Sequence, residues 1–188
     1  MQVLITFIFV WAIGLGGPAL VTADVNGDGR ADAVEFHHGV AEARGSDRGF
    51  LRWTSSSGQA HVSAVWRAWA ARAGDLDGDG KAEVVLGVWS RRTRHAEPEP
   101  HRTVWVIKWD GRRFVERWRG SALARPLQDF RLLGVKYEGV NLLIGRERLK
   151  SRCFLTAYKW NGFGFTGVAR QADICAPFCH GPKAEICQ

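Results

Sequence analysis

The nine-residue stretch Asp24-Val-Asn-Gly-Asp-Gly-Arg-Ala-Asp32 returns 51 positions later as Asp75-Leu-Asp-Gly-Asp-Gly-Lys-Ala-Glu83. Each copy is followed by an apolar run typical of a β-strand, Ala33–Phe36 after the first and Val84–Trp89 after the second. Copies at a fixed spacing indicate one structural unit that is repeated along the chain. We therefore interpret the rest of the sequence around these two stretches.

A β-hairpin pattern recurs with the same spacing. Asp110-Gly111 and Asn161-Gly162 each separate two runs of apolar and polar residues, and the two turns lie 51 residues apart. Such pairs favour a hairpin because both residues readily adopt a positive φ. An earlier hairpin is predicted over Phe50–Trp66, around a turn at Ser55–Gly58.

A third unit keeps the strand pattern without the acidic loop. Leu133–Gly145 ends like Val84–Gly87, and the third hairpin follows it. Each full unit has four strand candidates: one before the acidic loop, one after it, and the two arms of the hairpin. This pattern predicts an all-β, β-propeller-like fold of about three four-stranded blade repeats with a Cys-rich C-terminal tail. The alternative is a β-sandwich built from three hairpins.

The N-terminus predicts export. Residues 1–23 carry no charged side chain, and Val3–Ile13 is almost continuously apolar. We therefore predict a signal peptide over residues 1–17, with an uncleaved anchor or a buried strand as alternatives. The small residues in Val21-Thr22-Ala23 would also allow cleavage as late as residue 23, but that cut would delete the first strand. The expected location is secreted, periplasmic or at the cell surface.

The remainder divides into a repeat domain and a tail. The repeat domain spans residues 18–170, with units at about 18–68, 69–120 and 121–170, and the tail spans 171–188. The four cysteines are Cys153, Cys175, Cys179 and Cys187. An even number in an exported chain favours disulfides, whose pairing the sequence does not decide. The alternative is a metal site made by Cys175, Cys179, His180 and Cys187, which fits standard zinc spacing poorly.

Alternate positions of the acidic loops carry oxygen ligands suited to a hard cation. The expected ligands of the first loop are Asp24, Asn26, Asp28, the Arg30 carbonyl and Asp32. Those of the second loop are Asp75, Asp77, Asp79, the Lys81 carbonyl and Glu83. We predict two Ca²⁺ sites, because Ca²⁺ takes more oxygens than Mg²⁺ and tolerates a flexible loop.

Two other interpretations of these loops remain. The first is a plain acidic turn, which a second copy with the same spacing disfavours. The second is a dockerin-like EF-hand module, since Glu35 stands at the twelfth position of the first loop. The second loop has Leu86 there, and the short β-branched run Val84–Trp89 does not suit the helix that an EF-hand requires.

The stretch Asp75-Leu-Asp-Gly-Asp-Gly-Lys-Ala-Glu-Val-Val-Leu-Gly87 resembles the FG-GAP/VCBS repeat of integrin α-chain propellers and many exported bacterial proteins. The resemblance covers most of residues 19–168. It implies that each acidic loop joins the first two strands of a blade and holds calcium through the ligands named above. Leu133, Val135 and Tyr137 stand at the ligand positions of the third unit, so no metal is expected there.

Net charge and the absence of enzyme motifs favour some classes of function over others. Lys and Arg outnumber Asp and Glu by 26 to 19, and the net charge of +7 favours contact with acidic surfaces or anionic polymers. No signature of a hydrolase, metalloprotease or nucleotide-binding enzyme is found, which favours a binding protein. That absence does not exclude an enzyme, because the carboxylates of a glycosidase need no local motif.

We therefore predict an exported calcium-binding repeat protein that serves as a binding, adhesion or interaction module. Its expected partner is a protein or polysaccharide at the cell surface, with no specific nucleic acid. Closed propellers have about four to eight blades, so a homo-oligomer could complete the ring. A carbohydrate-binding or carbohydrate-active protein is the alternative, because Trp105, Trp109 and Trp118 alternate with arginines, although the favoured interpretation is that these tryptophans fill the core between blades.

Overall fold

The computed structural model describes residues 19–38, 48–91, 100–120 and 123–172, and every regular element in these ranges is a strand. The first sheet contains β1 (Ala19–Ala23), β2 (Asp32–His38), β3 (Gly49–Thr54) and β4 (Ala60–Val62). The second contains β5 (Ala68–Gly74), β6 (Glu83–Ser90), β7 (His101–Trp109) and β8 (Phe114–Arg119). The third contains β9 (Leu127–Tyr137), β10 (Val140–Leu149), β11 (Arg152–Trp160) and β12 (Phe165–Ala172). In the described part of the chain, no helix is long and apolar enough to cross a membrane.

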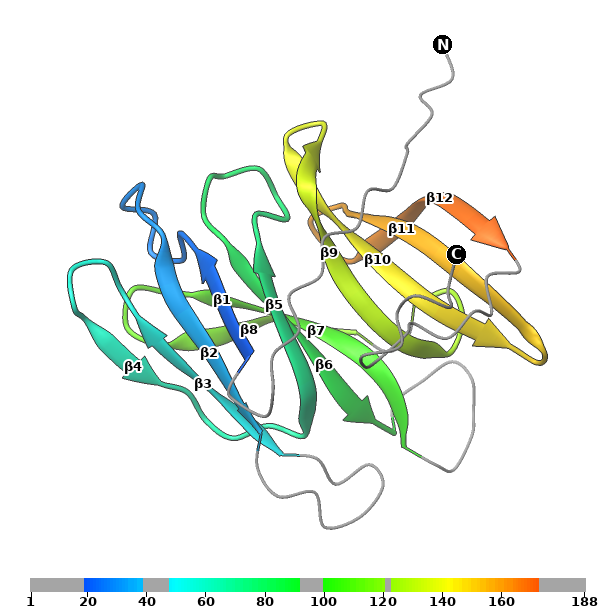
Figure 1. Cartoon of the computed structure of the whole chain (residues 1–188), viewed down its shortest axis with the longest axis horizontal. Coiled ribbons are helices and arrows are strands. Elements are labelled where there is room, and N and C mark those ends of the chain that lie inside the picture. The colour runs from blue at the N-terminus through cyan, green and yellow to red at the C-terminus, as the bar shows by residue number, and fades with distance from the viewer. Residues whose placement is uncertain (1–18, 39–47, 92–99, 121–122, 173–188) are drawn as a thin grey trace, which may run out of the picture.

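The three sheets lie in a row with the second sheet between the other two (Figure 1). Each is antiparallel, and its strands are neighbours in chain order. The first sheet packs against β5 through β1, β2 and β3, and the third packs against β5 and β7 through β9. The prediction of an all-β chain with three four-stranded repeats is thereby confirmed.

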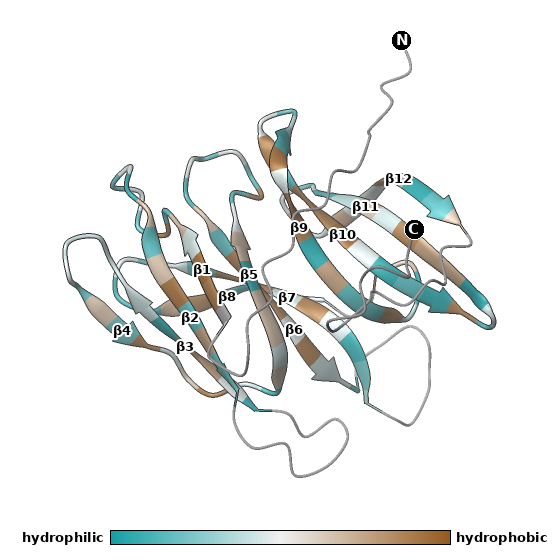
Figure 2. Ribbon diagram, in the orientation of Figure 1, coloured by the Kyte–Doolittle hydropathy of each residue, from teal (hydrophilic) through white to brown (hydrophobic). Residues whose placement is uncertain are grey.

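The middle sheet is covered on both faces, and this explains its composition. One core cluster joins the first two sheets through residues such as Phe36, Trp53 and Leu86, and another joins the last two through Val85 and Phe130. A strand buried on both sides needs apolar residues at successive positions, as in the run that follows Glu83. Strands with one exposed face alternate instead, as the bands along β2 in Figure 2 show.

Gly87 lets the second and third sheets approach closely. A Cβ atom at this position would lie 2.7 Å from Phe130 and 2.7 Å from Trp69. Neither ring could stay in place beside it, because real Cβ contacts are longer. The glycine in β6 is therefore a packing requirement rather than a turn residue.

The third sheet replaces the acidic loop with a tight turn. Glu138 and Gly139 connect β9 to β10 with φ values of 49° and 83°. Leu133, Val135 and Tyr137 lie within β9. The third unit thus lacks the acidic loop, as the sequence predicts.

Strand β1 bears on the export prediction, since Ala19–Ala23 pairs along its whole length with β2. Cleavage after residue 23 would remove this strand. The predicted signal peptide and the tail cysteines Cys175, Cys179 and Cys187 lie outside the described residues. Cys153 in β11 is disulfide-bonded.

Candidate metal centre

The two acidic loops occupy equivalent places, joining β1 to β2 and β5 to β6. Both contain two glycines in the left-handed region, with φ values between 79° and 85°, at Gly27, Gly29, Gly78 and Gly80. The sequence predicts this conformation at Gly29 and Gly80, because the backbone must turn sharply after the third acidic position. Carboxylates in both loops accept hydrogen bonds from the loop backbone, as Asp75 does from Gly78 at 2.7 Å.

The second loop brings carboxylates together. Asp75, Asp77 and Glu83 each offer a carboxylate oxygen, and these oxygens lie within 4.8 Å of one another. Asp75 and Glu83 are buried, and Asp77 is half-buried. Glu83, at the start of β6, also accepts a hydrogen bond from the Leu76 backbone N–H at 3.0 Å. In the described part of the chain, this is the one such group of acidic, His or Cys side chains.

Cationic side chains from neighbouring strands contact the same oxygens. Lys108 Nζ lies 2.6 Å from Asp79, 3.0 Å from Glu83 and 3.5 Å from Asp77. Arg117 Nη1 lies 2.5 Å from Asp77 and 3.0 Å from Glu83. These residues come from β7 and β8, and Glu83 comes from β6, so three strands of the second sheet contribute to the site.

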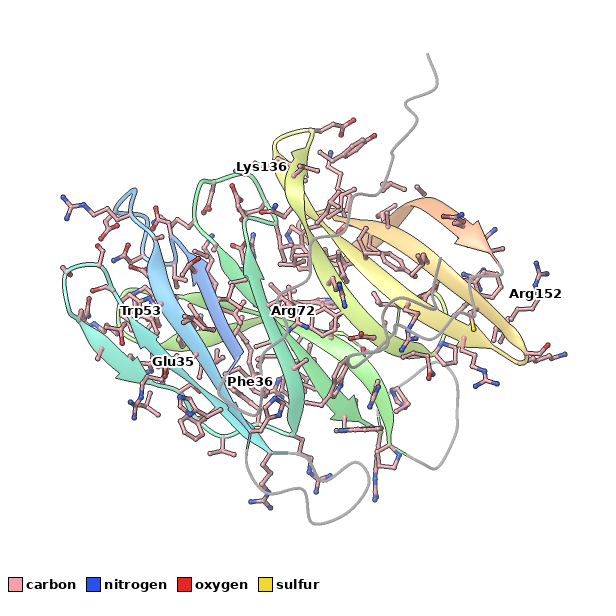
Figure 3. The ribbon with its side chains drawn as sticks, in the orientation of Figure 1. Glu35, Phe36, Trp53, Arg72, Lys136 and Arg152 are labelled. Carbon is pink, nitrogen blue, oxygen red and sulfur yellow. The ribbon has the colours of Figure 1, made fainter. Side chains whose placement is uncertain are left out.

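A third cation reaches the loop from the neighbouring sheet. Lys136, labelled in Figure 3, extends from β9 and places its Nζ 2.7 Å from Asp75. It is about half exposed, whereas Lys108 and Arg117 are mostly covered. The second loop therefore contacts cations from both its own sheet and the next one.

Burial and charge shift the pKa values of this cluster in different directions. Burial raises the pKa of Glu83 above its usual value, and this outweighs its hydrogen bonds. Burial also acts to raise the pKa of Asp77, but the hydrogen bonds from Arg117 and the Asp79 backbone outweigh it, so that pKa is lowered. For Lys108, burial is opposed by hydrogen bonds to Asp79 and Glu83, and its pKa rises above the ordinary range. Lys108 and Asp77 are therefore both ionised and form an ion pair in this site.

Asp79 and Lys81 lie at the edge of this cluster. Asp79 is bound to it through Lys108 and accepts the Lys81 backbone N–H at 2.9 Å. Asp79 is not one of the three converging acids. The Lys81 carbonyl as a ligand stays a prediction.

The first loop is arranged differently. Asp32 is buried, and its carboxylate accepts the Val25 backbone N–H at 3.0 Å, the Trp53 indole N–H at 3.0 Å and the Ser56 backbone N–H at 3.1 Å. These donors hold Asp32 toward β3, where Trp53 is labelled in Figure 3. The first loop also has the amide of Asn26 at the position where the second loop has Asp77, one of its three converging acids.

The remaining acids of the first loop are also satisfied by neutral donors. Asp24 accepts backbone N–H groups from Gly27 at 2.6 Å and Gly29 at 2.8 Å. Asp28 accepts the Arg30 backbone N–H at 2.9 Å, which is the main cause of its lowered pKa, and the Asn26 amide at 3.2 Å. A cation bound by Asp24, Asn26, Asp28, Asp32 and the Arg30 carbonyl stays a prediction, whereas the carboxylates converge in the second loop.

Both loops form joints between sheets, a role the sequence did not reveal. The Asp24 carbonyl accepts the Ala82 backbone N–H at 2.6 Å, linking the first loop to the second. The Asp75 carbonyl accepts the Asn141 backbone N–H at 2.7 Å, and the Asn141 side chain accepts the Asp75 N–H at 2.9 Å. Asn141 aligns with Glu83 when Leu142–Gly145 is matched to Val84–Gly87, and this alignment could have identified it.

The residues of the second loop fit a hard divalent cation. Its donors are carboxylate oxygens, they converge from positions 1, 3 and 9, and two of them are buried. Oxygen ligands of this kind suit Ca²⁺. Asp75, Asp77 and Glu83 would hold such an ion, and Lys108 and Arg117 touch two of these three carboxylates.

The predicted Trp and Arg face does not form one surface. Trp109 is buried in the core between the first two sheets, and Trp105 packs against that same core. Trp118 packs between the second and third sheets, with its ring 5.9 Å from that of Trp160 in an edge-to-face arrangement. The tryptophans therefore fill the space between sheets, as the alternative interpretation expects.

A separate groove of about 780 Å³ lies along the third sheet. Its lining includes the rings of Trp118, Tyr158 and Phe165, and the exposed ring of Phe163. Gly164, Gly167 and Ala169 contribute little volume and leave it hollow.

Its charged lining residues are Arg125 and Arg170, whose guanidinium groups lie 4.3 Å and 5.9 Å from the centre of the Phe154 ring. Arg125 is also held by the buried Glu147 carboxylate at 3.5 Å. The charge that this lining presents is therefore positive.

Comparisons with known proteins do not assign this geometry to a family. No protein-family model, no curated protein and no solved structure matches the chain. The likeness of Asp75–Gly87 to FG-GAP/VCBS repeats therefore rests on the loop residues themselves.

Proposed function

We propose that this protein is an exported calcium-binding repeat protein that serves as a binding or adhesion module, with calcium in a structural role. The observation that carries the proposal is the convergence of Asp75, Asp77 and Glu83 oxygens within 4.8 Å in a loop at the joint between two sheets. Such a position suits a structural ion better than a catalytic one, because the loop backbone is tied to Asn141 of the next sheet.

A cation held by these acids would join the three carboxylates and restrain the loop. Asp75 is the residue through which this restraint would reach the third sheet, since its backbone exchanges hydrogen bonds with Asn141. Metal binding and folding stability would then be coupled, because the unfolded chain lacks the preformed cage.

The proposed arrangement is propeller-like, with the acidic loops on the first connection of the first two blades. Three sheets in a row leave two outer faces, and a second copy of the chain could complete a ring. A protein or polysaccharide at the cell surface is the proposed partner. The dockerin-like alternative is disfavoured because strands β2 and β6 follow the loops where helices would be required.

The test is calcium-dependent thermal stability. We expect a chelator to lower the melting temperature of the full chain and added calcium to restore it. The double substitution Asp77→Ala with Asp79→Ala should weaken this response, because it removes two carboxylates around the proposed ion. Glu138→Gln is the matched control, since this exposed acid lies at the corresponding turn of the third sheet. A melting temperature that ignores both chelator and calcium would contradict the proposal.

Binding of an acidic carbohydrate is the second candidate, favoured by the groove along the third sheet. The exposed ring of Phe163 offers a flat surface for a sugar ring, and Arg125 and Arg170 offer guanidinium groups for carboxylates. We expect a uronic-acid oligosaccharide to bind in the presence of chelator, which removes any role of calcium. Arg170→Gln should weaken that binding, whereas Arg112→Gln in the second hairpin should not. Equal binding of a neutral oligosaccharide would count against this candidate.

A further inference from the structure

The three sheets place different side chains against the connection between their first two strands. In the second sheet these are Lys108 and Arg117, which contact the converging acids. In the third sheet, Lys159 lies 51 residues after Lys108 and pairs with Glu138 of the tight turn at 2.5 Å. In the first sheet, the neutral Ser56 donates its hydroxyl to Asp28 at 3.0 Å.

A β-bulge directs Arg117 toward the second loop. Trp118 pairs with Val106 and Glu116 pairs with Ile107, so Arg117 is the extra residue of β8. The third sheet has the same irregularity 51 residues later, where the extra residue of β12 is Val168. A bulge re-aims the side chain that occupies it. Both sheets therefore contain the bulge. Its extra residue is the cation Arg117 beside the converging acids of the second sheet, and the apolar Val168 in the third sheet.

Charge in the second loop is nearly balanced by the protein itself. Asp75, Asp77, Asp79 and Glu83 contact three cationic side chains, those of Lys108, Arg117 and Lys136. Within the described residues, the acids of the first loop accept hydrogen bonds from neutral groups instead. A divalent ion entering the second loop would meet Lys108 Nζ among the same oxygens, and two cations at this spacing repel each other.

We propose that Lys108 and Arg117 are built-in counter-ions that compete with a divalent cation for the acids of the second loop. This inference rests on the proposed calcium site and adds how that site is tuned. Asp77 and Glu83 must exchange contacts with Lys108 and Arg117 for contacts with the ion. The loop therefore keeps its shape without metal and binds calcium weakly, with a dissociation constant in the range of about 10⁻⁴ to 10⁻³ M that extracellular modules show.

The experiment compares calcium binding by calorimetry in full-chain variants. Lys108→Met keeps the aliphatic length and removes the charge, so it should bind calcium at least about tenfold more tightly than the unaltered chain. Lys159→Met is the matched control, because it removes the equivalent lysine of the third sheet, and it should leave the affinity unchanged. Lys136→Met removes a half-exposed cation from Asp75 and should shift the affinity in the same direction as Lys108→Met.

Thermal melting supplies the second readout. In chelator, Lys108→Met should melt below the unaltered chain, because the acids lose their internal counter-ion, and calcium should reverse this loss. If all variants bind calcium equally, the competition is overturned while the calcium site stands. If neither the unaltered chain nor Lys108→Met binds calcium, the calcium site and the competition are both overturned.

Discussion

At the scale of single residues, a buried carboxylate is stable only when its hydrogen bonds are satisfied. Glu147 in β10 is fully buried and meets this need in a different way from Glu83. It accepts hydrogen bonds from the Tyr158 hydroxyl and from Thr156 at 2.9 Å, and it pairs with Arg125. Burial and the adjacent Glu147 carboxylate both raise the pKa of Tyr158.

This environment predicts that Tyr158 stays neutral in the folded protein near pH 10, whereas a tyrosine in the unfolded chain ionises there. Because the folded pKa is raised, the stability that Tyr158 contributes is present below pH 10 or so and is lost as the pH rises further. Near pH 10, the native chain and Tyr158→Phe should show equal tyrosinate absorbance. In urea, the unaltered chain should show more tyrosinate absorbance than Tyr158→Phe, because Tyr158 is then exposed and ionises. An extra tyrosinate in the native unaltered chain near pH 10 would refute this assignment.

At the scale of elements, β6 is the strand on which both neighbouring sheets pack. Val84 and Leu86 belong to the core shared with the first sheet, and Val85 belongs to the core shared with the third. Gly87 follows them at the point where Phe130 and Trp69 come closest. Tight packing on both faces leaves this strand little room for added volume.

Gly87→Ala should therefore destabilise the protein by about 1–3 kcal/mol, because the added methyl group forces two rings to move. Gly134→Ala in β9 is the matched control, since nothing lies within 4 Å of a Cβ atom there. Urea unfolding of both variants provides the measurement. Equal stability of the two would show that the sheets do not approach as closely as described.

The sequence predicted the parts of this structure that depend on local pattern. The acidic loops and the Asp110-Gly111 and Asn161-Gly162 hairpins were identified because turn chemistry is encoded within a few residues. Lys108 and Asn141 were not, because their partners are distant in the chain, Asp79 for the first and Asp75 for the second. The unequal geometry of the two loops was also missed, because Asp32 is held by Trp53 and Ser56, which are distant from it in the chain.

At the scale of the whole molecule, the three sheets lie in a row and the same backbone hydrogen bond joins each sheet to the next. The carbonyl at the first position of each acidic loop accepts a backbone N–H of the following sheet or of its loop, from Ala82 in one case and Asn141 in the other. The acidic loops therefore lie where neighbouring sheets are held together (Figure 1). A cation in the second loop would act on this joint and so on the spacing of the repeat units.

The most direct measurement is the anomalous scattering of a lanthanide in crystals grown with that ion in place of calcium. The proposed function predicts a peak among the carboxylates of Asp75, Asp77 and Glu83, with Lys108 withdrawn from them. A map without a peak there, in which Lys108 and Arg117 still contact these acids at millimolar lanthanide, would contradict it.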